Sequence, residues 1–191
     1  MIEKVDRRIK YTRMVLKDSL ITLLKTKHLS AITVKELCKH ADVNRSTFYA
    51  HYKDPYDLLM NIEEEIIKGL NTYLNEQNFA ERQKALQTTE KLLEYVATNY
   101  KICHTLLNES ENTSFESKLM NVARNFLIKN WLTENKMGKS KSEYISTFIV
   151  SGSIHVIKHW LVNNMDKPPQ QIAEIINNIA NNGTRGIEGS G

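Results

Sequence analysis

The stretch from residue 32 to residue 59 constrains this chain most, because it packs several helix start and stop signals into a few turns. Thr33 followed three residues later by Glu36 is the capping-box pattern that begins a helix. Asp42 interrupts the apolar spacing where a short polar side chain tolerates a turn. Asn44 then stands at the N-cap position of a second helix. The spacing predicts two short helices joined by a tight turn.

The second of these helices, Asn44–His51, is too short and too polar to be a core element. Phe48 supplies its apolar side, and Asp54-Pro55 begins a third helix directly afterwards. Its other residues offer a cation, two hydroxyls, a phenol and an imidazole, which are groups that contact phosphates and base edges in a major groove. We therefore expect a DNA-reading helix-turn-helix, although an ordinary helical hairpin shares the generic pattern.

The particular residues go beyond that generic pattern. The chain reads TVKEL over residues 33–37 and RSTFYAHY over residues 45–52, with Ala41 and Val43 between them. This stretch closely resembles the DNA-binding signature of TetR-family transcriptional regulators. The resemblance implies a regulator that binds double-stranded operator DNA. With the chemistry above, it assigns DNA contacts to Thr33, Lys35, Asn44, Arg45, Ser46, Thr47, Tyr49, His51 and Lys53.

Two positions depart from the residues that are usual in that family. Asp42 stands where the family usually has Gly, so we expect a slightly strained turn or one held by the aspartate side chain. Pro55 stands where the family usually has a Lys that touches the DNA backbone. We expect Lys53, two residues earlier, to supply that charge. Arg45 is the best candidate for base readout, because a guanidinium can form two hydrogen bonds with guanine.

Charge is unevenly distributed along the chain. Residues 1–53 contain 12 Lys and Arg and 5 Asp and Glu, a net charge of +7, whereas the whole chain carries +4. A basic N-terminal part on a mildly acidic body is typical of a DNA-binding head. With only 7 Gly and 3 Pro, long helical periodicity and no alternating apolar run, the sequence predicts an all-α fold.

Cysteine content and hydropathy indicate the compartment. Cys38 and Cys103 lie far apart on expected helices, which argues against a disulfide framework and favours a cytoplasmic protein. We find no apolar run of about 18 residues and no apolar core typical of a signal peptide. We therefore expect neither secretion nor a membrane partner.

Helical periodicity divides the chain into parts. By resemblance, the helix of residues 55–75 relays the state of a bound ligand to the DNA-binding head, and we expect its Glu63, Glu64 and Glu65 to be solvated. Further helices are expected over residues 8–27, 115–131 and 144–162, and residues 84–107 are expected to form a helix and a shorter continuation. A last helix begins at Pro169. The predicted domains are a DNA-binding domain (1–53), a helical effector-binding and dimerisation domain (54–182) and a disordered tail (183–191).

The last two expected helices, 144–162 and 169–180, resemble the C-terminal pair through which many TetR-family proteins dimerise. Independently, a stripe of isoleucines near the C-terminus of a soluble chain requires a partner surface. Gly152 in mid-helix suggests that another helix passes close to it. We expect a homodimer whose recognition helices lie about 34 Å apart on a palindromic operator.

By the same resemblance, a small effector binds in the C-terminal domain. The candidate pocket residues are Tyr95, Tyr100, His104, Phe126 and Phe148, although aromatic residues at helical spacing usually belong to the core.

His155 and His159 are four residues apart, a spacing that can hold a metal, but no carboxylate or cysteine lies nearby in sequence to complete a site. The sequence has no Gly-rich phosphate loop, CxxC pair or nucleophile elbow. We therefore expect no metal, no cofactor and no enzymatic activity.

These observations favour a TetR-type repressor that leaves its operator when a small effector binds. Two alternatives remain open at this stage. The regulator could be controlled by a partner protein of the co-activator type, or the chain could be a helical binding module that has lost DNA affinity, in line with Asp42 and Pro55.

Overall fold

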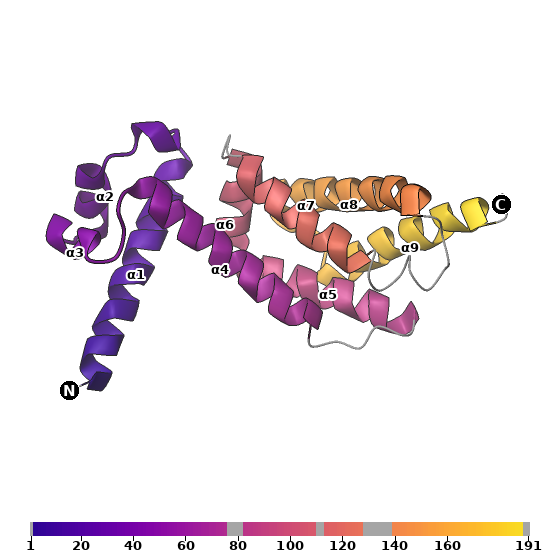
Figure 1. Cartoon of the computed structure of the whole chain (residues 1–191), viewed down its shortest axis with the longest axis horizontal. Coiled ribbons are helices and arrows are strands. Elements are labelled where there is room, and N and C mark those ends of the chain that lie inside the picture. Colours follow the sequence, from indigo (N-terminus) through magenta and orange to yellow (C-terminus); the bar gives the residue numbers. More distant parts are fainter. Residues whose placement is uncertain (1, 76–81, 110–112, 128–138, 189–191) are drawn as a thin grey trace. The chain divides into compact units, whose positions relative to one another are not determined.

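The chain folds as helices grouped in two compact units, seen in the computed structural model of Figure 1. The first unit comprises the chain up to Ile66, and the second is built on Ile67–Asn108 and the chain from Thr113 onward. The described part contains no strand, which confirms the all-α prediction. The described residues are 2–75, 82–109, 113–127 and 139–188.

The first unit begins with a long helix, which is followed by three short helical elements and the start of a second long helix. Its first helix begins at Ile2 and ends at Leu24, whereas the sequence predicted residues 8–27. Residues 2–8 are polar but contain no Gly or Pro, and polarity alone does not stop a helix. The elements of this unit are α1 (Ile2–Leu24), the 3₁₀ turn η1 (Leu29–Ala31), α2 (Val34–Ala41), α3 (Arg45–Tyr49) and the first part of α4 (Pro55–Asn75).

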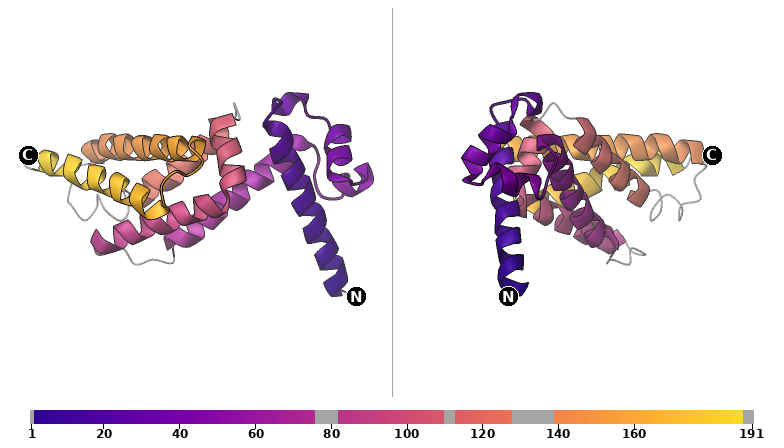
Figure 2. Two further views of the ribbon diagram at one scale, coloured as in Figure 1. Left: turned by 180° about the vertical axis from the view of Figure 1, so that it is seen from behind. Right: turned by 60° about the vertical axis from the view of Figure 1, so that its left-hand side comes forward.

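A small apolar core holds these helices together. Helix α1 packs against α2, and α2 packs against α3 (Figure 2). Burying one such side chain contributes about 1.5–3 kcal/mol relative to exposure, so a handful suffices to fix three short helices. The fully buried side chains are Leu16, Leu20, Ile21, Leu37, Phe48, Leu58, Leu59, Ile62 and Ile66.

Helix α4 has the predicted bounds, but one of its acidic residues is not solvated as expected. Glu63 is only 2% exposed, whereas Glu64 and Glu65 lie at the surface. The reason is helical spacing, since position 63 shares a face with the buried residues Leu59 and Ile66. Glu65 accepts an ion-paired hydrogen bond from Lys17 of α1 at 3.1 Å.

The second unit contains the remaining helices. Helix α9 packs along α5, and α8 packs against α6, α7 and α9. The predicted segment 84–107 is interrupted at Asn99, where a new helix begins, and it ends in a π-helical turn. The elements are α5 (Arg82–Thr98), α6 (Tyr100–His104), the π turn η2 (Thr105–Glu109), α7 (Thr113–Leu127), α8 (Lys139–Val162) and α9 (Pro169–Glu188).

The turn between α8 and α9 is tied to a buried tryptophan. Trp160 is 2% exposed, and its indole N–H donates to the carbonyl of Lys167 at 2.8 Å. Asn164 and Met165 adopt positive φ angles, 54° and 55°, which reverse the chain direction. Pro169 then begins α9, as the sequence predicted.

Three predictions about the second unit were wrong. Helix α8 begins at Lys139, earlier than the expected residue 144, and α9 continues to Glu188 into the segment predicted as a disordered tail. Two glycines near the end of α9 cost about 1 kcal/mol each against Ala, which does not stop an established helix. Among the described residues, no atom outside the local helix backbone lies within 4 Å of the place where a Cβ of Gly152 would stand, so no described helix of the same chain passes close to it.

Some predicted features fall outside the described residues. These are residues 128–131 of the helix expected over 115–131 and residues 189–191 of the expected tail.

One described helix meets the length and composition of a membrane span. Residues 142–162 have a mean hydropathy of 1.2 and are 33% buried. The core helix of a soluble protein meets the same criterion.

Candidate nucleic-acid interface

The turn between α2 and α3 is built by two caps. The hydroxyl of Thr33 accepts a hydrogen bond from the N–H of Glu36 at 3.2 Å, as the capping pattern predicted, while the Glu36 carboxylate pairs with Lys27. At the other end, Asp42 adopts the left-handed conformation with φ 53° and ψ 47°. An L-residue pays about 1–2 kcal/mol for that conformation, less for Asp than for most, so the expected strain is present here.

Phe48 anchors α3 to the first unit. It is fully buried, and its ring meets Tyr49 edge-on at 5.5 Å and Tyr52 at 5.9 Å between centroids. The α-helix proper ends at Tyr49, two residues before the predicted end, and the chain continues as a turn in which His51 and Tyr52 both donate to the Phe48 carbonyl. With Phe48 buried, Arg45, Ser46 and Tyr49 of α3 are exposed.

The residues predicted to bind DNA occupy the open side of this helix-turn-helix. Thr33, Lys35, Asn44, Arg45, Ser46 and Lys53 are exposed, Tyr49 is 59% exposed, and Thr47 and His51 are half-buried. Asn44 lies at the N-cap of α3 but makes no side-chain cap bond. Its side chain is therefore not occupied in capping the helix.

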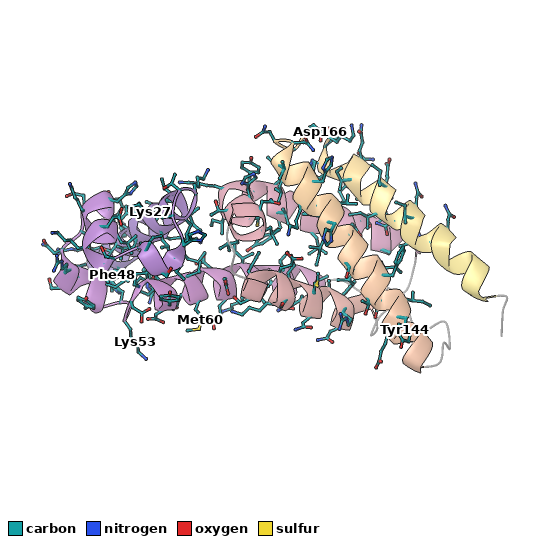
Figure 3. The ribbon with its side chains drawn as sticks, turned by 90° about the horizontal axis from the view of Figure 1, so that it is seen from above. Lys27, Phe48, Lys53, Met60, Tyr144 and Asp166 are labelled. Carbon is teal, nitrogen blue, oxygen red and sulfur yellow. The ribbon has the colours of Figure 1, made fainter. Side chains whose placement is uncertain are left out.

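A pair of aspartates fixes the backbone at Lys53. The Lys53 N–H donates to the Asp57 carboxylate at 2.9 Å, and the Asp57 N–H donates to the Asp54 carboxylate at 2.9 Å. Figure 3 shows Phe48 inside the first unit and Lys53 pointing away from it. The backbone of Lys53, two residues before α4 begins, is thus held in place by a side chain of that helix.

Two arginines act electrostatically on buried groups beside the interface. Burial raises the pKa of the Cys38 thiol, and the positive charge of Arg45 opposes that rise. Burial likewise raises the pKa of the Tyr52 phenol, and the charge of Arg13 on α1 opposes it. The charges of Arg45 and Arg13 therefore act on buried groups of the helix-turn-helix, although both side chains are exposed.

The predicted effector residues do not form one group. The rings of Tyr100 and His104 are in contact, tilted by 48° with centroids 5.3 Å apart, and the Tyr100 hydroxyl donates to Asn164 at 3.2 Å. Tyr95 lies against Gly69 of α4, and Phe126 is half-buried on α7. Phe148 does not join them, because it is 76% exposed on α8.

The histidine pair of α8 is engaged within its own helix. His155 Nδ1 lies 2.8 Å from the Ser151 carbonyl, and His159 Nε2 lies 3.0 Å from the Asn163 amide nitrogen. Over the described residues, no group of three or more possible metal ligands occurs.

Sequence reasoning missed some exposed or unpaired polar residues. Tyr56, in the first turn of α4, is 55% exposed. Arg124 on α7 has a buried Nε atom without a hydrogen-bonding partner among the described residues. Neither carries a sequence signal, because a polar residue in an amphipathic helix is normally solvated.

Comparison with known proteins decides the family. The TetR_C_8 family, described as a transcriptional regulator C-terminal region, matches residues 83–182, which is more than half of the chain. The chain belongs to the TetR family of transcriptional regulators. It is a DNA-binding, helix-turn-helix protein, and the resemblance seen in the N-terminal stretch is confirmed by an independent match to the C-terminal region.

A curated relative agrees with the TetR-family assignment. The uncharacterised HTH-type transcriptional regulator YxbF of Bacillus subtilis (strain 168) is 26% identical over 96 residues. That alignment covers 48% of this chain and 25% of the relative, so this TetR-family chain spans about a quarter of that protein's length.

Solved structures of TetR-family regulators share the fold. A TetR transcriptional regulator from Streptococcus agalactiae 2603V has a TM-score of 0.64 at 21% identity, covering 94% of this chain and 99% of that one. The fatty acid degradation regulator FadR from Bacillus halodurans gives 0.68 at 14%, over 91% and 96%. FadR from Bacillus subtilis, solved with stearoyl-CoA, gives 0.64 at 15%, over 87% and 96%.

Proposed function

We propose that this TetR-family chain is a cytoplasmic homodimeric repressor that binds a palindromic operator and leaves it when a small effector binds. The observation that carries the DNA-binding part is α3, on which Phe48 is fully buried while Arg45, Ser46 and Tyr49 face outward. A short helix with one anchored side and a polar outer face fits a major groove.

The exposed residues divide into those that read bases and those that bind the DNA backbone in this proposal. Arg45 reads a guanine edge through two hydrogen bonds, and Ser46 and His51 contact either a base or the backbone. The remaining groups bind phosphates and fix the register without reading sequence. They are Thr33, Lys35, Asn44, Thr47, Tyr49 and Lys53, all of which are at least partly exposed.

The exposed apolar side chains of α8 and α9 support dimerisation. Along α8, Tyr144 is 78% exposed, Phe148 76% and Val162 54%, and Gly152 has open space where a Cβ would stand. On α9, Ile175 is 40% and Ile179 59% exposed. Exposed apolar side chains of this kind favour a covering surface, and the same two helices of a second copy provide one.

A second copy fits this surface better than a membrane. Lys158 of α8 is ion-paired with Glu116 at 2.8 Å, and His155 and His159 are exposed on the same helix. Placing such groups in hydrocarbon costs several kcal/mol, whereas a protein interface accommodates them.

Small-molecule control is proposed on the family's known behaviour. Among its structural neighbours, FadR from Bacillus subtilis was solved in complex with stearoyl-CoA. The second unit of this chain, from Ile67 onward, is the corresponding place for an effector.

In vitro transcription tests the direction of control. A promoter that overlaps the operator is transcribed with increasing amounts of wild-type protein or of the Arg45→Ala variant. We expect wild type to lower transcript yield and Arg45→Ala to leave it unchanged. Higher yield with wild type would identify an activator. If a co-purifying protein relieves the repression and small molecules do not, the effector part of the proposal is overturned.

A further inference from the structure

Two exposed histidines lie one turn apart on helix α8. His155 and His159 are four residues apart, so their imidazole rings stand on the same face of the helix. Two histidines at this spacing can bind one metal ion together, and imidazole is a preferred ligand of zinc, copper and nickel. The pair therefore has the spacing of a chelating site.

The hydrogen bond of the first ring fixes which of its nitrogens can bind a metal. His155 Nδ1 lies 2.8 Å from the Ser151 carbonyl oxygen. Because a carbonyl can only accept, Nδ1 carries the proton, and Nε2 of the neutral ring carries the lone pair. A ring N–H that donates to a backbone carbonyl is also the arrangement that orients metal-binding histidines in proteins.

The second ring presents a lone pair on the same nitrogen. The side-chain amide nitrogen of Asn163 lies 3.0 Å from His159 Nε2 and 2.9 Å from the His159 carbonyl oxygen. Because an amide nitrogen can only donate, His159 Nε2 accepts and carries a lone pair. Asn163 is exposed directly after α8, so a metal ion can displace its amide into water. Both histidines can thus bind an ion through Nε2.

One chain supplies two protein ligands at this place. Among the described residues, no group of three or more His, Cys, Asp or Glu is close enough together to hold a metal ion. Lys158, on the same helix, is ion-paired with Glu116 at 2.8 Å, so that carboxylate is already engaged. Water must fill the remaining positions around an ion, which therefore keeps its charge and part of its hydration shell.

The histidine pair shares its face of α8 with large exposed apolar side chains. Tyr144 is 78% exposed and Phe148 is 76% exposed. The spacings between positions 144, 148, 155 and 159 are four or seven residues, which keep all of them on one face. This is the face that a second copy is proposed to cover. A hydrated divalent ion is costly to bury in an apolar interface, so the ion and the second copy compete for the face.

We propose that His155 and His159 bind a first-row divalent transition-metal ion of the zinc class, and that the bound ion opposes dimerisation through α8. The metal site rests on the two rings alone, whereas its effect on dimerisation rests on the proposed homodimer. The sequence alone predicted no metal, because it offered no third ligand. The metal acts at the surface between two copies and not inside the second unit.

Calorimetric titration of the metal-free, full-length protein with zinc chloride tests the metal site. We expect zinc to bind wild type, and magnesium, which prefers oxygen ligands, not to bind. His155→Gln and His159→Gln should each lower zinc affinity at least about tenfold, because each removes one ligand. His28→Gln removes an exposed histidine of the first unit and is the matched control, which should bind as wild type. Absence of zinc binding by wild type, or equal zinc affinity of all these proteins, would overturn the site.

A change at Asn163 tests which nitrogen of His159 binds the metal. Asn163→Ala removes the donor that an ion must displace from His159 Nε2, so we expect zinc to bind this variant more tightly than wild type. Asn178→Ala, at an exposed position of α9, is the control and should leave zinc affinity unchanged. Weaker zinc binding by Asn163→Ala would contradict the assignment of Nε2.

Sedimentation velocity with and without zinc tests the effect on dimerisation. We expect zinc to convert wild-type dimers into monomers and to leave His155→Gln dimeric. If zinc binds through the histidine pair but the dimers stay intact, the metal site stands and the competition is overturned. If wild type is monomeric without zinc, the proposed homodimer and the competition both fail, and calorimetry alone decides the metal site.

Discussion

The hydroxyl of Tyr95 on α5 occupies the place where a Cβ atom of Gly69 on α4 would lie, and the ring carbons behind it are also too close for a methyl group. Gly69 is therefore required here by packing rather than by backbone conformation. The end of the Tyr95 side chain can lie against α4 at this point because Gly69 has no side chain.

Replacing this glycine should reveal that contact. Gly69→Ala forces the Tyr95 ring to move, and overpacking of this kind costs about 1–3 kcal/mol, which outweighs the gain of about 1 kcal/mol from better helix propensity. We expect a lower free energy of unfolding by urea denaturation.

A double-mutant cycle provides the control for Gly69→Ala. In a Tyr95→Ala background the same change should become stabilising by up to about 1 kcal/mol, because only the propensity term remains. If Gly69→Ala has the same effect in both backgrounds, the contact with Tyr95 is not the reason why glycine is needed at position 69.

The left-handed turn residue Asp42 leads to a second prediction. Asp42→Gly removes the steric cost of φ 53°, so we expect higher stability, by about 0.5–1 kcal/mol, in thermal unfolding. Asp42→Val should be destabilising, because a β-branched residue is poorly tolerated there. A destabilising glycine would mean that the Asp42 side chain contributes more than the strain costs.

The buried thiol of Cys38 predicts a dependence of stability on alkaline pH. Its pKa is raised in the folded chain, chiefly by burial, so the unfolded thiol loses its proton first as pH rises. The protonated thiol of Cys38 therefore makes its full contribution to stability at pH values below 9.0, the ordinary pKa of a cysteine. This contribution is lost as the pH rises through the higher pKa of the folded chain. We expect the urea midpoint to fall between pH 8 and pH 10 more steeply for wild type than for Cys38→Ala. Parallel slopes would contradict this.

The exposed ring of Phe148 predicts the oligomeric state. Phe148→Glu places a charge in the proposed interface between α8 and α9 of two copies, so we expect sedimentation velocity to show monomers where wild type shows dimers. Tyr11→Glu, which changes an aromatic residue 63% exposed on α1, is the matched control and should remain dimeric. A dimeric Phe148→Glu protein would place the interface elsewhere.

Local signals made the helix-turn-helix predictable. The Thr33 cap, the turn at Asp42 and the start of α4 at Pro55 each depend on neighbours within four residues, and all three are present in the structure. The burial of Glu63 was not foreseen, because it depends on how α4 packs and not on its own sequence neighbours.

The second unit was less predictable for the same reason. Helices α8 and α9 were recognised, but the apolar periodicity did not mark their ends at Lys139 and Glu188, which lie in polar stretches. The unpaired donors of Arg124 and Asn108 are a property of three-dimensional packing. No spacing in the sequence distinguishes them from solvated polar residues.

Selection of random duplex DNA by the purified protein at near-physiological salt tests the central claim most directly. A dimer that reads DNA through α3 should recover a two-fold palindrome with half-sites about one helical turn apart, and Arg45→Ala should lose the specified guanine. Lys53→Ala should keep the same palindrome but bind it more weakly, with a salt dependence lower by about one counterion. Recovery of no shared sequence by folded, dimeric wild-type protein would contradict the account, as would an unchanged palindrome from Arg45→Ala.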